Sequence, residues 1–117
     1  MKKYNIKNYI RYKNDIALAI KRIKDKPWEE YNNREMIIKF LPLVENIARK
    51  FSTSQQASGV MTIMDLIQSG SMGLIQAVKK LDRVRLIESE DKEKTLKSFL
   101  SKRIKGSIRR QIDINRG

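Results

Sequence analysis

The sequence contains neither cysteine nor histidine, and these two absences narrow the chemistry open to the protein. Without cysteine there is no disulfide and no thiolate metal site. Without histidine as well, most nucleophile–base pairs, zinc sites and proton shuttles are excluded. The 13 acidic residues are scattered or clustered in one loop-like stretch, and no G-x-x-x-x-G-K-S/T phosphate loop occurs. We therefore expect a protein that is not an enzyme and that uses no cofactor or metal.

Long apolar runs are also absent from the sequence. No stretch approaches the roughly 20 apolar residues that a membrane-spanning helix needs. The basic beginning, "MKKYNIKNYI", is not followed by a long apolar run with a small-residue cleavage site. We expect a cytoplasmic protein with no membrane partner. The length of 117 residues fits one domain, and 40% apolar residues are enough for a core.

Acidic residues are few compared with basic ones, at 13 against 26, which gives a net charge of +13. Such an excess favours a polyanionic partner, and we expect nucleic acid rather than an acidic membrane surface. The alternative is a lysine-rich surface that only keeps the protein in solution.

Apolar residues recur three and four positions apart along most of the chain. This spacing predicts helices over 6–24, 33–51, 62–81 and 95–114. Pro42 either kinks the second helix or opens a new one. Thr62, with Asp65 three residues later, predicts a capping box at the start of the third helix. The polar stretch 52–59 reads as a loop. The expected fold is all-α, a compact bundle of about four to five helices in one domain, 1–117.

The third predicted helix contains two glycines, Gly70 and Gly73, within "DLIQSGSMGLIQAVKKL". An interior glycine costs a helix about 1 kcal/mol relative to alanine. Small residues at this spacing let a neighbouring helix backbone approach closely, so we predict a tight helix crossing. No strand precedes the glycines, which argues against a phosphate-binding turn.

The same helix has an outward stripe of Asp65, Gln68, Met72 and Ile75, flanked by Ser69 and Ser71. A solvent-facing stripe is normally rich in lysine and glutamate, but this one mixes an acid, an amide, a thioether and an isoleucine. A low-charge surface on a very basic protein favours a protein partner. An ordinary helix surface is the alternative.

The last predicted helix is strongly basic. Its cations cover about half of the helix surface and are Lys102, Arg103, Lys105, Arg109 and Arg110. The remaining side carries Phe99, Ile104, Ile108 and Ile112, which either pack in the core or touch a ligand. A basic helix with an aromatic near its start suits phosphate contacts together with base stacking. A solvated basic face is the alternative.

Taken together, these segments resemble the second conserved region of the bacterial sigma-70 family. "DLIQSGSMGLIQAVKKLD" resembles the signature of that region almost position for position, and "FLPLVENIARKF" resembles the segment before it. "SFLSKRIKGSIRRQI" is similar to the final helix, especially in the flagellar and sporulation branches, although a phage-type member also fits. The resemblance covers residues 15–117.

The resemblance implies a sigma factor, or its promoter-recognition domain, that binds core RNA polymerase and directs transcription initiation at promoter DNA. The third helix would dock on the clamp coiled coil of the largest polymerase subunit through Asp65, Gln68, Ser69, Ser71 and Ile75. The last helix would face the minus-ten element, with Phe99 holding a flipped adenine and Lys102 and Arg103 on phosphates or bases. Lys105 belongs to the same surface, and Gly106, Arg109 and Arg110 match positions near the upstream duplex edge.

The resemblance also divides the chain. Residues 1–30 would form a helix like the one that precedes region 2, 33–82 the docking helices, 83–94 an acidic linker and 95–117 the DNA-facing helix. Family members continue beyond "INRG", so we expect a fragment or a second protein that supplies the minus-thirty-five-binding domain. An anti-sigma factor is a further partner to consider. Two alternatives remain: a general nucleic-acid-binding helical protein, and a polymerase-binding adaptor that does not read promoters.

Overall fold

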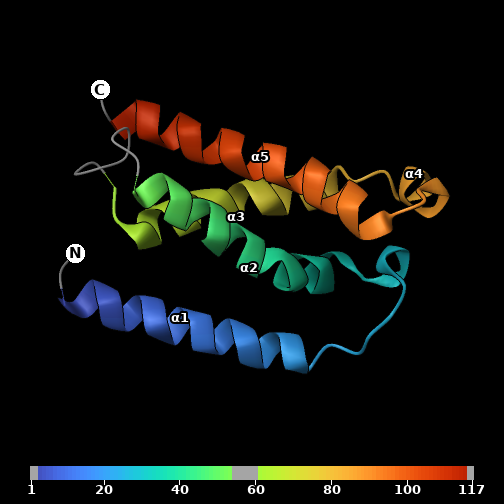
Figure 1. Ribbon diagram of the computed structural model, residues 1–117, viewed down its shortest axis with the longest axis horizontal. Helices are drawn as coiled ribbons and strands as arrows, with labels where there is room; N and C mark the ends of the chain where they lie inside the picture. The colour runs from blue at the N-terminus through green and yellow to red at the C-terminus, as the bar shows by residue number, and fades with distance from the viewer. Residues whose placement is uncertain (1–2, 54–60, 116–117) are drawn as a thin grey trace.

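The computed structural model describes residues 3–53 and 61–115, which form five α-helices and one short 3-10 helix (Figure 1). The predicted all-α fold is confirmed, and these ranges contain no strand. In chain order the elements are α1 (Lys3–Lys21), η1 (Trp28–Glu30), α2 (Asn33–Ser52), α3 (Ile63–Lys79), α4 (Arg83–Glu88) and α5 (Lys92–Asn115).

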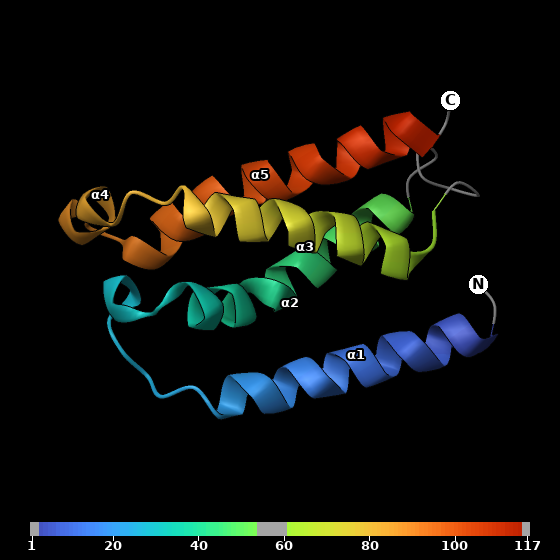
Figure 2. The same cartoon turned by 180° about the vertical axis from the view of Figure 1, so that it is seen from behind.

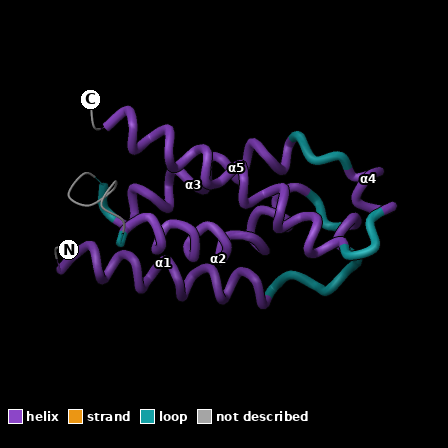
Figure 3. The backbone as a smooth tube through the Cα atoms, turned by 45° about the horizontal axis from the view of Figure 1, so that its top comes forward, coloured by secondary structure: helices purple, strands orange, loops and turns teal. Residues whose placement is uncertain are grey.

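The four long helices run in alternating directions, α1 and α3 one way and α2 and α5 the other (Figure 1, and from behind in Figure 2). α3 lies between α2 and α5 and makes its most extensive contacts with these two helices. α1 lies along the outer side of α2, as the backbone trace in Figure 3 also shows. α4 and η1 lie together at one end of the bundle, and the beginning of α1 and the end of α5 lie at the other.

The core is formed by the apolar stripes that the helical spacing predicts. Burying each large aliphatic side chain contributes about 1.5–3 kcal/mol. The largest side chains that are almost completely buried come from α2, α3, α4 and α5: Met36, Val44, Leu66, Ile67, Leu74, Val78, Leu86, Leu96, Leu100, Ile104 and Ile108. α1 contributes much less, because Ile16 is the only buried residue among its positions 7–21.

Two capping boxes start α2 and α3. The predicted box at Thr62 is present: Thr62 Oγ1 accepts from the Asp65 backbone N–H at 3.1 Å, and the Asp65 carboxylate accepts from Thr62 N–H at 3.1 Å. Asn32 and Glu35 form the same pair of bonds at the start of α2. Pro42 lies inside α2, which continues through it to Ser52, so Pro42 does not open a second helix.

The predicted linker 83–94 is partly wrong, because it contains α4 and the first turn of α5. α4 begins where Asp82 Oδ1 accepts from the backbone N–H groups of Val84 and Arg85, and Leu86 is buried. The acidic residues cap and start helices here, since carboxylates are stabilised at a helix N-terminus. α1 ends at Lys21, earlier than predicted, and most of the predicted loop 52–59 lies outside the described residues.

The α4 end of the bundle is tied to η1 and α2 by polar bonds. The Arg83 guanidinium donates to the carbonyl oxygens of Glu29 and Tyr31, at 3.1 and 2.6 Å, and to Asn33 Oδ1 at 2.9 Å. Lys92 Nζ lies 2.8 Å from Glu29 Oε1, and this bond lowers the pKa of the Glu29 carboxyl. These bonds join the beginnings of α4 and α5 to the η1 region.

The predicted tight crossing is confirmed between α3 and α5. A Cβ atom built on Gly73 would lie 2.7 Å from Ser107 Cβ and 2.9 Å from the Arg103 carbonyl oxygen. One built on Gly70 would lie 2.9 Å from Val44 Cγ1. Ser107 Oγ also donates to the Ser69 carbonyl oxygen at 2.7 Å across the crossing. Glycine lowers the intrinsic stability of α3, and in return its missing side chain lets α5 pack closely against α3.

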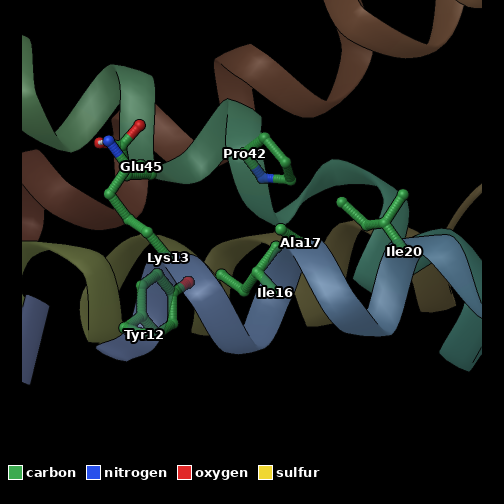
Figure 4. Close-up of a pocket in the computed structure, with 7 residues that line it drawn as sticks. All are labelled: Tyr12, Lys13, Ile16, Ala17, Ile20, Pro42 and Glu45. Carbon is green, nitrogen blue, oxygen red and sulfur yellow. Dashed lines mark ion pairs between the residues drawn. The ribbon is translucent and has the colours of Figure 1, made fainter. Parts of the chain in front are cut away.

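One buried carboxylate of α2, Glu45, bonds to α1. Glu45 accepts from the Tyr9 hydroxyl, and its Oε1 lies 3.2 Å from Arg49 Nε and 3.8 Å from Lys13 Nζ. Figure 4 shows Ile16 and Ala17 of α1 facing α2 near Pro42, at a pocket of about 170 Å³ between the two helices. Polar bonds at Glu45 and the packing of Tyr9, Tyr12 and Ile16 together align α1.

Two glycine-to-alanine substitutions should change stability in opposite directions. Gly73→Ala forces the α3–α5 crossing apart and should lower the free energy of unfolding by about 1–3 kcal/mol. Gly106→Ala should raise it by about 0.5–1 kcal/mol, because a Cβ there meets nothing within 4 Å and alanine favours a helix. Thermal melting followed by circular dichroism measures both. A Gly73→Ala variant at least as stable as the parent would contradict the crossing.

Tyr9 should titrate later than an ordinary tyrosine. Burial, followed by its hydrogen bond to Glu45, raises its pKa from 10.0 to about 12. The neutral hydroxyl is thus favoured in the folded state, and its contribution is complete below pH 10.0 and lost as the pH rises towards 12. Tyrosinate absorbance should show a late step that Tyr9→Phe removes. If the step that is lost in that variant lies near pH 10.0 instead, the Glu45 contact is contradicted.

Candidate functional site

The outward stripe of α3 lies where the sequence predicts it. Asp65, Gln68, Met72 and Ile75 are all exposed, with 59% of Met72 and 37% of Ile75 accessible. At 100° per residue these positions point away from Gly70 and Gly73, which face α2 and α5. Met72 and Ile75 are exposed apolar side chains on a highly charged protein, and such a patch suits a protein partner.

The two serines that flank this stripe differ from the other predicted contact residues. Ser69 is only 7% exposed, on the side of α3 where its carbonyl oxygen accepts from Ser107. Ser71 is half-buried on the other side, beside Tyr12 of α1, whose pKa is raised above its ordinary value, chiefly by burial. Of the five predicted contact residues, Asp65, Gln68 and Ile75 are accessible.

Asp65 has a second role within α3. Its carboxylate completes the capping box with Thr62 and lies in the first helical turn. Replacing it with a basic residue would remove one of the two capping-box bonds, the one from Thr62 N–H, and would place a positive charge at the positive end of the helix dipole. Asp65 is therefore a poor single probe of the surface, because a substitution there changes stability as well.

The basic surface of α5 is exposed as predicted. The cations Lys102, Arg103, Lys105, Arg109 and Arg110 are all accessible, and none of them forms an ion pair with a described carboxylate. Ile104, Ile108 and Ile112 are 0–2% exposed, so they belong to the core and are not ligand contacts. Unpaired cations along one helix can neutralise a row of phosphates.

Gly106 lies on this basic surface. It is exposed, and its missing side chain leaves open space within 4 Å. Nothing in the described part of the fold requires glycine at this position. Its absent side chain would let a bound backbone or base edge approach α5 closely.

Two of the α5 arginines lie over aromatic rings. The guanidinium of Arg103 is 5.2 Å from the centroid of Phe99, and that of Arg109 is 5.8 Å from the centroid of Phe51. Both distances fall within the range of cation–π attraction. The five α5 cations are therefore not equivalent in the free domain.

Phe99 packs against the core, and its contact with a base stays a prediction. It is half-buried, and it also lines a pocket of about 320 Å³ between the α3–α4 connection, α4 and α5. The residues that line this pocket are Lys80, Leu81, Asp82, Arg85, Leu86, Thr95 and Phe99. One part of the Phe99 ring thus packs against the core, and another part is accessible from the pocket.

The sequence analysis missed Lys80, Asp82 and Arg85 as candidates for this pocket. Lys80 and Asp82 lie at the end of the predicted docking helices and Arg85 in the predicted linker, so no shared surface with Phe99 could be assigned. Asp82 could have indicated the start of α4, because aspartate is a preferred N-cap residue and apolar residues of α4 follow it.

The described residues hold no cluster of three or more His, Cys, Asp or Glu side chains that could bind a metal ion. Within the same ranges, no helix combines the length and apolar character needed to span a bilayer.

A helical domain with one low-charge surface and one row of unpaired cations has the features of a module that joins a protein partner to nucleic acid. Residues 36–116 match the family described as Sigma-70 region 2, and the chain belongs to that family. No curated protein and no solved structure gives a match. α1 and η1 precede the matched range.

Family membership confirms the predicted class of function. Region 2 of a sigma factor binds core RNA polymerase and recognises the minus-ten promoter element, and the chain is a sigma factor domain of this kind. Its partners are core RNA polymerase and promoter DNA. Sigma factors are not enzymes, which agrees with the expectation drawn from the missing cysteine and histidine.

Proposed function

We propose that the outward stripe of α3 docks on the clamp coiled coil of the largest polymerase subunit, while α5 and the Phe99 pocket hold the unpaired minus-ten strand. The observation that carries this proposal is the α3–α5 crossing. It presents the stripe and the cationic helix on different sides of one rigid helix pair. One domain can then contact polymerase and promoter at the same time.

The docking surface is centred on Gln68, Met72 and Ile75. Exposed apolar side chains beside an amide, with no lysine before Lys79, are the composition expected near the centre of a protein interface. Asp65 contributes at the edge of this surface and caps the helix. Ser71 lies at the border with α1 and contacts the partner only if the interface extends that far. Ser69 is buried, and its carbonyl oxygen bonds to Ser107 across the α3–α5 crossing.

The Phe99 pocket suits one unstacked base. Its volume of about 320 Å³ lies within the range of small-ligand clefts. Phe99 offers a ring for stacking, and Lys80 and Arg85 offer charges for the flanking phosphates. The Asp82 carboxylate can accept a hydrogen bond from an exocyclic amino group, which adenine and cytosine carry and thymine lacks.

The described α5 surface binds the rest of the strand chiefly through charge. Phe99 is the only aromatic residue after Phe51, and the residues that follow it on the exposed side of α5 include the cations Lys102 and Arg103. Strand binding in this protein should therefore depend strongly on salt concentration. Lys105, Gly106, Arg109 and Arg110 would contact the upstream edge of the element.

The other helices also have roles in this proposal. α1 would act as the helix that precedes region 2, and residues 33–82 and 92–115 would supply the docking and DNA-facing helices. The "RIKGSIR" segment of α5 and the intrahelical Pro42 support the flagellar, sporulation or phage-type branch. The site of action is the bacterial cytoplasm, where core RNA polymerase works.

A pair of charge substitutions should test the docking surface. Met72→Arg with Ile75→Arg should weaken binding to core RNA polymerase at least about 30-fold, because hot-spot side chains contribute about 2 kcal/mol or more. The matched control is Ile10→Arg with Leu18→Arg, which changes two aliphatic residues of α1 that are 53% and 54% exposed. Equal losses in both variants would show a general charge effect and remove the assignment.

Phe99→Ala should weaken binding of single-stranded minus-ten DNA to the complex with core polymerase. Loss of one stacked base corresponds to about 1–3 kcal/mol, or five- to 150-fold in affinity. The slope of log affinity against log salt should stay the same, because no phosphate contact is lost. A variant that melts many degrees lower but binds the strand normally would make Phe99 a core residue only.

A further inference from the structure

Arg103 and Phe99 form a local pair on α5. They are four residues apart, so they lie one helical turn from each other on the same side of the helix. The guanidinium of Arg103 lies over the ring, 5.2 Å from its centroid. Arg103 is exposed and forms no ion pair with a described carboxylate, yet it is not among the residues that line the Phe99 pocket.

The backbone at Arg103 is held in place by α3. Its carbonyl oxygen would lie only 2.9 Å from a Cβ atom on Gly73, and the next residue, Ile104, is completely buried. The Arg103 side chain therefore leaves α5 from a fixed point. Its stem has to reach back one turn towards Phe99, a geometry that the direction of helical side chains favours.

We infer that Arg103 is a positioning residue that braces the Phe99 ring for base capture. The inference rests on the proposed function of the Phe99 pocket. An aromatic ring has two faces. The Arg103 guanidinium covers one face of Phe99, and the pocket, which Arg103 does not line, leaves another part of the ring accessible. With one face covered, the ring is held in one orientation and a base stacks on the other face.

A guanidinium suits this role better than an ammonium group. It is planar and weakly hydrated, and it stacks on aromatic rings, whereas a lysine ammonium is a compact and strongly hydrated charge. Lys102, the preceding residue, shows the contrast. It is exposed and has the same charge, and the described rings include none in contact with it.

The bracing role and a phosphate contact differ in salt dependence. A cation that neutralises a phosphate on a single strand contributes about −0.7 to the slope of log affinity against log salt. A cation that only supports a ring contributes nothing to that slope. The two roles also differ in what they need from the strand, since stacking requires a base and phosphate binding does not.

The test uses the full chain bound to core RNA polymerase and two oligo(dT) probes, one with a single central adenine and one with an abasic site there. Affinities are measured over a series of salt concentrations for the parent, Phe99→Ala, Arg103→Ala, Arg103→Lys, Lys102→Ala and the double variant of Phe99→Ala with Arg103→Ala. Circular dichroism checks that each variant is folded.

Arg103→Ala should weaken binding of the adenine probe about three- to tenfold, as expected for loss of a cation–π contact. It should leave the abasic probe and the salt slope unchanged, and Arg103→Lys should restore only part of the loss. The double variant should bind no more weakly than Phe99→Ala. Lys102→Ala should weaken both probes equally and reduce the slope by about 0.7.

Two results would overturn the inference while leaving the base pocket intact. One is an Arg103→Ala variant that weakens both probes equally and lowers the salt slope, which would make Arg103 a phosphate contact. The other is a loss in the double variant equal to the sum of the two single losses, which would make Arg103 and Phe99 independent. If Phe99→Ala itself fails to distinguish the probes, the proposed pocket fails and the bracing role fails with it.

Discussion

The close contact between α3 and α5 at Gly73 is the constraint on which the rest of this domain depends. Any side chain at that position would meet Ser107 and the backbone of Arg103. Because the two helices touch at backbone distance, the residues around the contact have fixed positions on both of them. The exposed stripe of α3 and the cations of α5 consequently keep one relative orientation, which a domain that bridges polymerase and promoter requires.

Much of this arrangement could be predicted from the sequence, because it depends on residue type and spacing within single helices. The glycines indicated the crossing, Thr62 and Asp65 indicated the helix start, and the stripe from Asp65 to Ile75 was correctly placed outside. Each of these features follows from local geometry alone. The family signature then assigned a class of function to surfaces that composition had already marked as unusual.

What could not be predicted depends on contacts between segments that are distant in sequence. α4 has only six residues, too few for a helical period to be recognised, and it is held in place by Arg83 bonds to the η1 region. The pocket beside Phe99 was missed with it. Ser69 and Ser71 look equivalent in the sequence, but Ser69 faces α5 and Ser71 faces α1. Helical periodicity shows which side of a helix a residue lies on, but not which other helix packs against that side.

The polar attachment of α1 has a consequence for where this domain ends. The family match begins at residue 36, yet the bonds that hold the bundle together cross that boundary. Glu45 is shielded by Tyr9, Arg83 is anchored on the carbonyl of Tyr31, and α2 is capped by Asn32. Removing the residues before 36 would take away the cap of α2 and the buried Tyr31 of the core, and both losses are destabilising. The unit that folds is therefore larger than the unit that defines the family, and the N-terminal helix is part of the scaffold.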